Sequence, residues 1–277
     1  MSEASPAHQD PDQATLAASF GGVAAHYERF RPGPPPAAVD WYLYRRLDRV
    51  IDLGSGTGAL ARLLVGRVGE VVAVEPDDRM REILAAEVPD VVALRGTGES
   101  MPLPDACADA VIASTSWHWM DPAATSEEVA RVLVPGGVLG ALWTAPDPDG
   151  PFLAEARALL SRQLAAAGTS PVDDLTLVLD RSDGRDEFVF ALPGDAPFDP
   201  PERETFRWDI PLDADELIGL LGTFSRVITL PGDRRDRILT EARRLLAVLG
   251  IEGDTTVDVA WRSDAWRTCR KGAGTSS

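Results

Sequence analysis

A glycine-rich segment between two short apolar runs has residue types and spacing that could bind a ligand. Asp52-Leu53-Gly54-Ser55-Gly56-Thr57-Gly58 follows the first run, and the second run ends at Glu75. Glycines let a ligand come close to the backbone because no side chain intervenes, and an acid about 20 residues further on can accept both hydroxyls of a ribose. The segment therefore predicts a site for a nucleotide-like ligand.

Asp52 decides which nucleotide is expected. The spacing Gly54-x-Gly56-x-x-Ala59 also fits the dinucleotide fingerprint. A dinucleotide, however, would bring a doubly negative pyrophosphate to the turn, and a carboxylate at the strand end would oppose its attraction to the helix N-terminus. S-adenosylmethionine (SAM) has no phosphate, and a nearby carboxylate favours its sulfonium and α-ammonium groups. We therefore expect SAM as the cofactor and S-adenosylhomocysteine as its product.

The composition narrows the class of partner. Asp and Glu number 44 against 27 Lys and Arg, a formal net charge of −17, whereas nucleic-acid binders need a positive surface. No apolar run approaches the roughly 20 residues of a membrane span, and the N-terminus lacks a basic-then-apolar signal. The two cysteines, Cys107 and Cys269, form no metal-type pair. We expect a cytoplasmic protein that binds no nucleic acid, membrane or metal.

The candidate ligand-binding residues must be held together, and the hydrophobic pattern predicts a sheet that can do so. Short apolar runs predict strands near residues 50–53, 71–75, 91–95, 110–114 and 138–143, with helices near 58–65, 78–86 and 123–133 between them. This alternation predicts a doubly wound, mostly parallel α/β sheet. The ligand should lie at the carboxyl edge of the strands, where Asp52, Glu75 and Ser114 emerge.

The remaining segments predict four regions in the chain. Residues 1–14 and 271–277 are expected to be disordered tails. Residues 15–145 form the cofactor-binding core, with cap helices near 14–27 and 37–47. Residues 146–270 hold an insertion that forms a lid or substrate region, then the strands that complete a seven-stranded sheet. The predicted elements there are helices near 152–166, 214–222 and 234–249 and strands near 204–210 and 255–261. In the simplest interpretation, Arg262–Arg267 extends the last of these strands.

Four segments together resemble the class I SAM-dependent methyltransferases, and the likeness spans roughly residues 18–262. They are the Asp52–Gly58 motif, Glu75-Pro76-Asp77, Gly96–Pro104, and Ser116-Trp117-His118-Trp119-Met120-Asp121. The chain looks closest to the small-molecule branch that includes trans-aconitate and quinone-type methyltransferases. The resemblance implies a Rossmann-like fold, a ribose contact at Glu75 and Pro76, and an adenine loop that contains Thr97, Gly98 and Glu99.

The adenine loop departs from the family at Thr97. Many relatives have an aspartate there that accepts a hydrogen bond from the adenine amino group. A hydroxyl can still accept. Glu99 either replaces the missing aspartate or is simply solvated.

The segment Tyr27-Glu28-Arg29-Phe30-Arg31-Pro32 also resembles a family element that folds over the cofactor. Arg31 suits the methionine carboxylate because its guanidinium can engage both carboxylate oxygens. The other interpretation is a surface arginine before a proline turn. Tyr27 either caps the pocket or packs its helix.

Methyl transfer requires alignment and exclusion of water more than it requires reactive side chains. His118 is the candidate general base, because its ordinary pKa suits neutral pH; its alternative role is packing beside the cofactor. Trp117 and Trp119 are candidates to line the pocket, with one ring near the sulfonium. In the alternative, one of them packs beneath the loop.

These observations predict a SAM-dependent methyltransferase that methylates an O, N or C nucleophile of a small-molecule acceptor in a biosynthetic pathway. An NAD(P)-dependent oxidoreductase is the rival enzyme class. It typically needs a Tyr and Lys pair or a catalytic zinc, and the only lysine is Lys271. A SAM-binding protein that does not transfer methyl groups is the third possibility.

Overall fold

The computed structural model describes residues 30–167 and 190–272. The described part contains a seven-stranded sheet in the order β3-β2-β1-β4-β5-β7-β6. The expected helix near 14–27, Tyr27 and the N-terminal tail lie outside the described residues. The strands are β1 (Arg49–Leu53), β2 (Glu70–Val74), β3 (Val92–Leu94), β4 (Ala108–Ser114), β5 (Leu133–Pro146), β6 (Glu202–Leu212) and β7 (Val257–Cys269).

Strands β1 to β5 are parallel, and β7 runs antiparallel to both of its neighbours. Parallel strands are covered on both faces, which explains why β1, β2 and β4 read as nearly continuous Val, Ile, Leu and Ala. The prediction of a mostly parallel, seven-stranded α/β sheet is confirmed. The strand order reverses direction at β1, which lies between β2 and β4, and such reversal points open a crevice at the carboxyl edge.

Helices cover both faces of the parallel strands. One face packs on α6 through a core that includes Val129 and Val132. The other face packs on α3, α4 and α5 through a core that includes Tyr42, Leu60 and Leu84. The helices of this part are α3 (Pro36–Tyr42), α4 (Ala59–Leu64), α5 (Asp78–Glu87), the 3₁₀ turn η1 (Trp117–Trp119) and α6 (Pro122–Val132).

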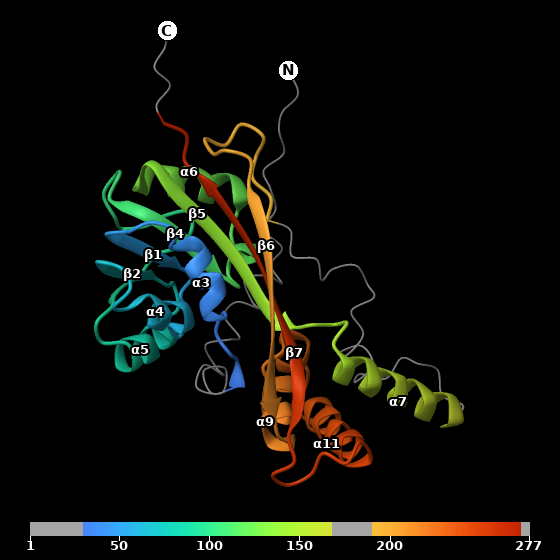
Figure 1. The fold of residues 1–277 in the computed structure, drawn as a ribbon. Helices are drawn as coiled ribbons and strands as arrows, with labels where there is room; N and C mark the ends of the chain where they lie inside the picture. The colour runs from blue at the N-terminus through green and yellow to red at the C-terminus, as the bar shows by residue number, and fades with distance from the viewer. Residues whose placement is uncertain (1–29, 168–189, 273–277) are drawn as a thin grey trace, which may run out of the picture.

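The antiparallel pair of β6 and β7 extends beyond the parallel strands and supports a second group of helices (Figure 1). This pair of strands contributes four side chains to an apolar core shared with these helices: Trp208, Ile210, Val259 and Trp261. A further core forms between the helices themselves. They are α7 (Pro151–Ala167), α9 (Ala214–Leu221), α10 (Ser225–Ile228) and α11 (Gly232–Val248). We call them the outer helices.

Several elements differ in length from the sequence-based expectation. The helix expected over 37–47 ends at Tyr42, whose buried hydroxyl donates to the carbonyls of Ala141 and Trp266 at 2.8 and 3.1 Å. The strand expected over 138–143 runs on to Pro146, because β7 pairs with it as far as Trp261. The residues from Arg262 to Arg267 belong to β7, where the buried Ser263 and Ala265 alternate with part-buried neighbours.

No helix in the described ranges is long and apolar enough to cross a membrane.

Candidate active site

Three glycines with positive φ shape the turn between β1 and α4. The φ angles are 66° at Gly54, 55° at Gly56 and 94° at Gly58, a region that other residues rarely adopt. A Cβ on Gly54 would lie 2.6 Å from the Cβ of Ser116, whereas a Cβ on Gly56 would meet nothing within 4 Å. Gly54 is therefore required by packing, while the backbone at Gly56 faces open space that a ligand can occupy.

Asp52 is fully buried at the carboxyl end of β1 and stabilises the start of α4. Its Oδ2 accepts a 3.0 Å hydrogen bond from the Ala61 amide, a role that the N-cap residue Gly58 cannot fill without a side chain. Its Oδ1 has no hydrogen-bond partner among the described residues. Burial raises the pKa of Asp52 to about 7; the Ala61 amide opposes this shift and the nearby charge of Glu75 adds to it.

Glu75 lies directly after β2, and its carboxylate joins that strand to the glycine turn. Oε2 accepts from the amide of Gly56 and Oε1 from the amide of Asp77, both at 2.9 Å. Burial raises the pKa of Glu75, and the two amide bonds oppose this shift. Each carboxylate oxygen has a second lone pair, so these two bonds leave room for a vicinal diol to donate. Pro76, the next residue, is exposed.

The segment after β4 packs directly against the glycine turn. Ser114, half-buried, ends the strand, and Thr115 adopts a φ of 53°. The hydroxyl of Ser116 then donates to the Leu53 carbonyl at 2.6 Å. Only a residue without a Cβ fits beside Ser116 at Gly54, so η1 is placed next to the turn. The sequence analysis assigned no role to Ser116. Its place at the start of the family-like segment Ser116–Asp121 could have indicated one.

Trp117 belongs to the core. Its side chain is 2% exposed, and its ring lies 5.2 Å from that of Phe190. The structure thus places this tryptophan beneath the loop, as in the packing alternative. Trp119 is only part-buried, and its ring centroid lies 4.5 Å from that of His118.

His118 accepts a 3.0 Å hydrogen bond at Nδ1 from the indole N–H of Trp143. An indole nitrogen can only donate, so Nδ1 carries no proton and the neutral ring is protonated at Nε2. Desolvation lowers the pKa of His118 to about 4. Near neutral pH, His118 is therefore neutral and its Nδ1 lone pair is engaged by Trp143, while the general-base role stays a prediction.

The loop expected to bind adenine is held close to the start of α6. Thr97 is exposed and forms an isolated bridge with Ser100. A Cβ on Gly98 would lie 2.6 Å from Sδ of Met120 and 2.9 Å from the hydroxyl of Thr125, so the loop packs tightly there. Glu99 accepts a 2.8 Å hydrogen bond from the amide of Asp121, the N-cap residue of α6. Glu99 thus anchors the loop to α6.

Arg31 lies where the outer helices meet the cofactor-binding core. Its Nε donates to the Thr223 hydroxyl at 2.9 Å, and its guanidinium carbon lies 5.0 Å from the centroid of the Phe224 ring. Two residues further on, the Cα of Gly33 is so close to α4 that a Cβ would lie 3.3 Å from the Ala59 carbonyl. Sequence reasoning missed Thr223, which follows α9 and is fully buried.

The residues at this edge fit SAM. The buried oxygens without partners in the described part of the chain include Oδ1 of Asp52 and Oγ of Ser55, both beside the turn. Gly56 leaves an open approach to the backbone. Two buried carboxylates suit a ligand with cationic groups and a ribose, and they oppose a pyrophosphate.

Comparisons with known proteins identify the family. Residues 51–141 match the family model described as "Methyltransferase domain". A protein described as an uncharacterized methyltransferase of Mycobacterium tuberculosis is 39% identical over 232 residues, 84% of this chain and 87% of that protein. A demethylmenaquinone methyltransferase of Thermus thermophilus is 34% identical over 138 residues, 47% of this chain and 63% of that protein.

Solved structures agree with these relatives. A structure described as a proposed type II methyltransferase from Anaeromyxobacter dehalogenans is 25% identical, with a TM-score of 0.59, and the match covers 88% of this chain and 99% of that one. A second, from Anabaena variabilis, has the same fold, with 18% identity, a TM-score of 0.52 and coverage of 83% and 95%. The oxidoreductase alternative is not favoured. The chain belongs to the class I SAM-dependent methyltransferases.

Proposed function

We propose that the protein binds SAM at the carboxyl edge of β1 and β2 and transfers its methyl group to an O, N or C nucleophile of a small molecule in a biosynthetic pathway. The observation that carries the cofactor assignment is the joint arrangement of Asp52, Gly56 and Glu75. The backbone of Gly56 is open to a ligand. The carboxylate of Asp52 suits a cationic group, and that of Glu75 suits the two hydroxyls of a ribose. S-adenosylhomocysteine is the expected product.

Each part of SAM has a proposed partner. Glu75 and Pro76 bind the ribose, and Asp52 faces the cationic amino acid end. Arg31 pairs with the methionine carboxylate. The backbone of the turn and the adenine loop supply the remaining contacts, with the end of β4 and η1 beside them. These remaining residues are Gly54, Ser55, Gly56, Gly58, Thr97, Gly98, Glu99 and Ser114. Trp117 is a candidate from the sequence, but its side chain packs in the core against Phe190.

Catalysis in this proposal depends on positioning. SAM supplies a methyl group already activated by its sulfonium, so the protein aligns the acceptor with that methyl group and keeps water out. His118 follows β4, where the acceptor and the cofactor are proposed to meet, and its ring is neutral near neutral pH. An acceptor that must lose a proton would pass it to another group, because Trp143 engages the Nδ1 lone pair.

Three observations support a small-molecule acceptor. The net charge of −17 disfavours approach to a nucleic acid. The outer helices are joined to the cofactor-binding core through Arg31 and Thr223, which places an additional layer of structure beside the proposed site. The Thermus relative is named as a demethylmenaquinone methyltransferase, and its match, over 47% of this chain, lends the quinone-type resemblance loose support.

Calorimetry with SAM, S-adenosylhomocysteine and NAD tests the cofactor assignment. We expect both sulfur compounds to bind and NAD not to bind; binding of NAD alone contradicts the proposal. Transfer of a labelled methyl group from SAM is then measured with small hydroxyl, amine and carbon-acid acceptors, and with RNA and protein as controls. Methylation confined to RNA or protein would overturn the small-molecule assignment.

A further inference from the structure

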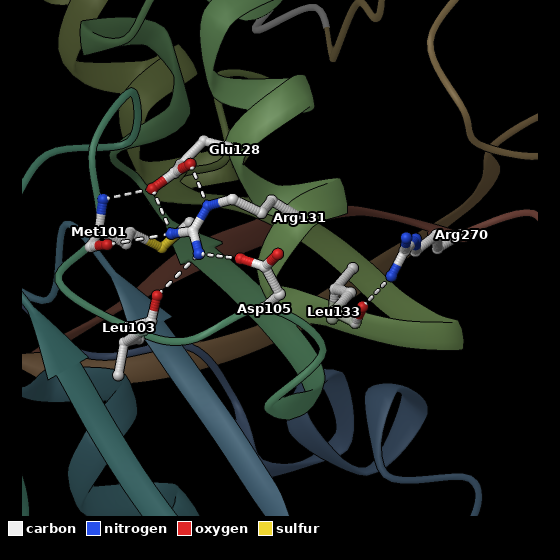
Figure 2. A network of polar contacts seen from close by, with 7 residues as sticks. All are labelled: Met101, Leu103, Asp105, Glu128, Arg131, Leu133 and Arg270. Carbon is white, nitrogen blue, oxygen red and sulfur yellow. Dashed lines mark hydrogen bonds and ion pairs between the residues drawn. The ribbon is translucent and has the colours of Figure 1, made fainter.

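The adenine loop is fastened to α6 by a network of side chain–backbone contacts centred on Arg131 (Figure 2). Nη1 of Arg131 donates to the Leu103 carbonyl at 2.8 Å and to Asp105 at 2.7 Å. Nη2 donates to the Met101 carbonyl at 3.1 Å. Nε and Nη2 also pair with the two oxygens of Glu128, each at 2.8 Å. A single guanidinium thus contacts the loop at three residues.

Glu128 completes the network from the preceding turn of α6. Its Oε1 accepts a 2.7 Å hydrogen bond from the Met101 amide while it also pairs with Arg131. Met101 is therefore held through both its N–H and its C=O, much as a strand residue is held by a neighbouring strand. The Arg131 guanidinium lowers the pKa of Glu128, although its burial opposes this shift, so Glu128 stays ionised at neutral pH.

The other end of the loop is tied to the first turn of the same helix. Glu99 accepts from the amide of Asp121, and Asp121 itself caps α6 by accepting from the amide of Ala124 at 2.8 Å. One rigid helix thus holds the loop at both ends. The backbone bonds within the loop itself are the pair between Thr97 and Ser100, at 3.1 and 3.2 Å, and the bond from the Leu103 amide to the Met101 carbonyl at 2.8 Å.

We propose that Glu128 and Arg131 are positioning residues for the cofactor, which hold the loop from Thr97 to Asp105 in the conformation that receives the adenine ring. This inference rests on the proposed function, because it takes the loop as the adenine-binding segment. Neither residue touches the cofactor. They act by fixing the loop before SAM arrives, so that binding does not have to order it.

The geometry makes the role specific to an arginine. Five donors in a planar fork reach two carbonyls and two carboxylates at once, and an ammonium group cannot reproduce that arrangement. Lysine at position 131 would keep the charge and lose most of the loop contacts. Likewise, glutamine at position 128 keeps an acceptor for the Met101 amide but loses the ion pair.

The test compares affinity for two ligands that share the adenosine part. SAM and 5′-methylthioadenosine, which lacks the amino acid end, are titrated into Arg131→Lys, Glu128→Gln and Glu128→Ala. We expect Arg131→Lys and Glu128→Ala to weaken both ligands by a similar factor, on the order of tenfold, with Glu128→Gln intermediate. Equal loss for both ligands locates the effect at the adenosine part that they share and not at the amino acid end.

Arg49→Gln is the matched control. Arg49 also pairs with a glutamate, Glu70, at 2.6 Å, and donates to a carbonyl, that of Cys107, but it lies at the start of β1 and contacts no residue of the loop from Thr97 to Asp105 through these bonds. We expect Arg49→Gln to lower stability without changing affinity. Unchanged affinity for both ligands in the Arg131 and Glu128 variants overturns the inference, as does an equal loss in the control. Failure of the wild-type protein to bind SAM would instead overturn the proposed function.

Discussion

The indole N–H of Trp143 on β5 donates a 3.0 Å hydrogen bond to Nδ1 of His118 on η1. Trp143 is itself buried, and its ring meets that of Trp266 edge-on, with centroids 5.3 Å apart. The donor is therefore held in place by the core. Because the indole cannot accept, this contact fixes which nitrogen of His118 carries the proton, and it disfavours protonation of the ring.

The first prediction concerns the titration of His118. We expect nitrogen NMR to find the Nε2–H tautomer and a pKa near 4. Trp143→Phe removes the donor and admits water, so the pKa of His118 should rise towards its ordinary value of about 6.5. Because the folded-state pKa lies below the unfolded one, the contribution of His118 to the free energy of unfolding should fall as pH decreases from about 6.5 towards 4.

Trp117→Phe is the control for that titration. It removes a buried indole of similar size on the same 3₁₀ turn, whose Nε1 has no partner within the described ranges. The pKa of His118 should stay low in this variant. An ordinary pKa for His118 in the wild-type protein, or the same shift in both variants, would contradict the tautomer assigned from the hydrogen bond.

The second prediction concerns Asp52. Its folded-state pKa of about 7 lies above the unfolded value, so the folded protein binds the extra proton, and stability should fall as pH rises from about 4 to 7. The slope from one such group is at most about 1.4 kcal/mol per pH unit. Urea unfolding should show this slope in the wild-type protein and a weaker slope in Asp52→Asn, which keeps an oxygen for the Ala61 amide.

Cofactor binding should change the protonation of Asp52. A bound sulfonium and ammonium favour the carboxylate, so SAM binding near pH 7 should release a proton and tighten as pH rises. Calorimetry in buffers with different ionisation enthalpies measures that release. Glu75 also has a raised pKa, so Glu75→Gln is titrated in parallel. Proton release that persists unchanged in Asp52→Asn would show that another group is responsible.

The third prediction separates two glycines of the turn. Alanine at Gly54 combines a φ of 66° with a Cβ that would lie 2.6 Å from Ser116, so we expect unfolding to become easier by about 2–4 kcal/mol. Alanine at Gly56 also has strained φ but meets no neighbour, and the loss should be about 1–2 kcal/mol. Its main effect should be weaker SAM binding, because the new methyl group occupies the ligand's approach.

Denaturant unfolding and SAM titration, applied to both glycine variants, distinguish the two roles. The interpretation of Gly56 as the ligand-facing glycine is wrong if Gly56→Ala binds SAM as tightly as the wild-type protein.

Local sequence patterns predicted the strands and the turn that form the proposed cofactor site. They could not predict contacts between residues far apart in the chain. The strand ending at Asp52 and the acid at Glu75 could be found because glycine spacing and apolar runs are short-range signals. The bond between Arg31 and Thr223 joins residues 192 positions apart, and no pattern in one sequence specifies such a pair. Strand ends were also misjudged where pairing with β7 decides them, as at Pro146.

The contacts of α6 with the adenine loop show an intermediate case. A glutamate and an arginine three positions apart on a helix predict an ion pair. They do not predict that Arg131 also reaches the carbonyls of Met101 and Leu103, because the path of a loop depends on what packs beneath it.

The last prediction decides between two roles for Arg31, the methionine carboxylate contact and a purely structural tie to the outer helices. Arg31→Lys keeps the charge but loses the planar fork and the Nε donor to Thr223. If Arg31 pairs with the carboxylate, this variant should weaken SAM by about tenfold and leave 5′-methylthioadenosine unchanged, since that ligand has no carboxylate. Thr223→Val, which removes the acceptor for Nε, should cause a smaller loss of the same kind, and Thr223→Ser should restore it. If all three variants bind both ligands as tightly as the wild-type protein and only their stability falls, Arg31 has the structural role alone.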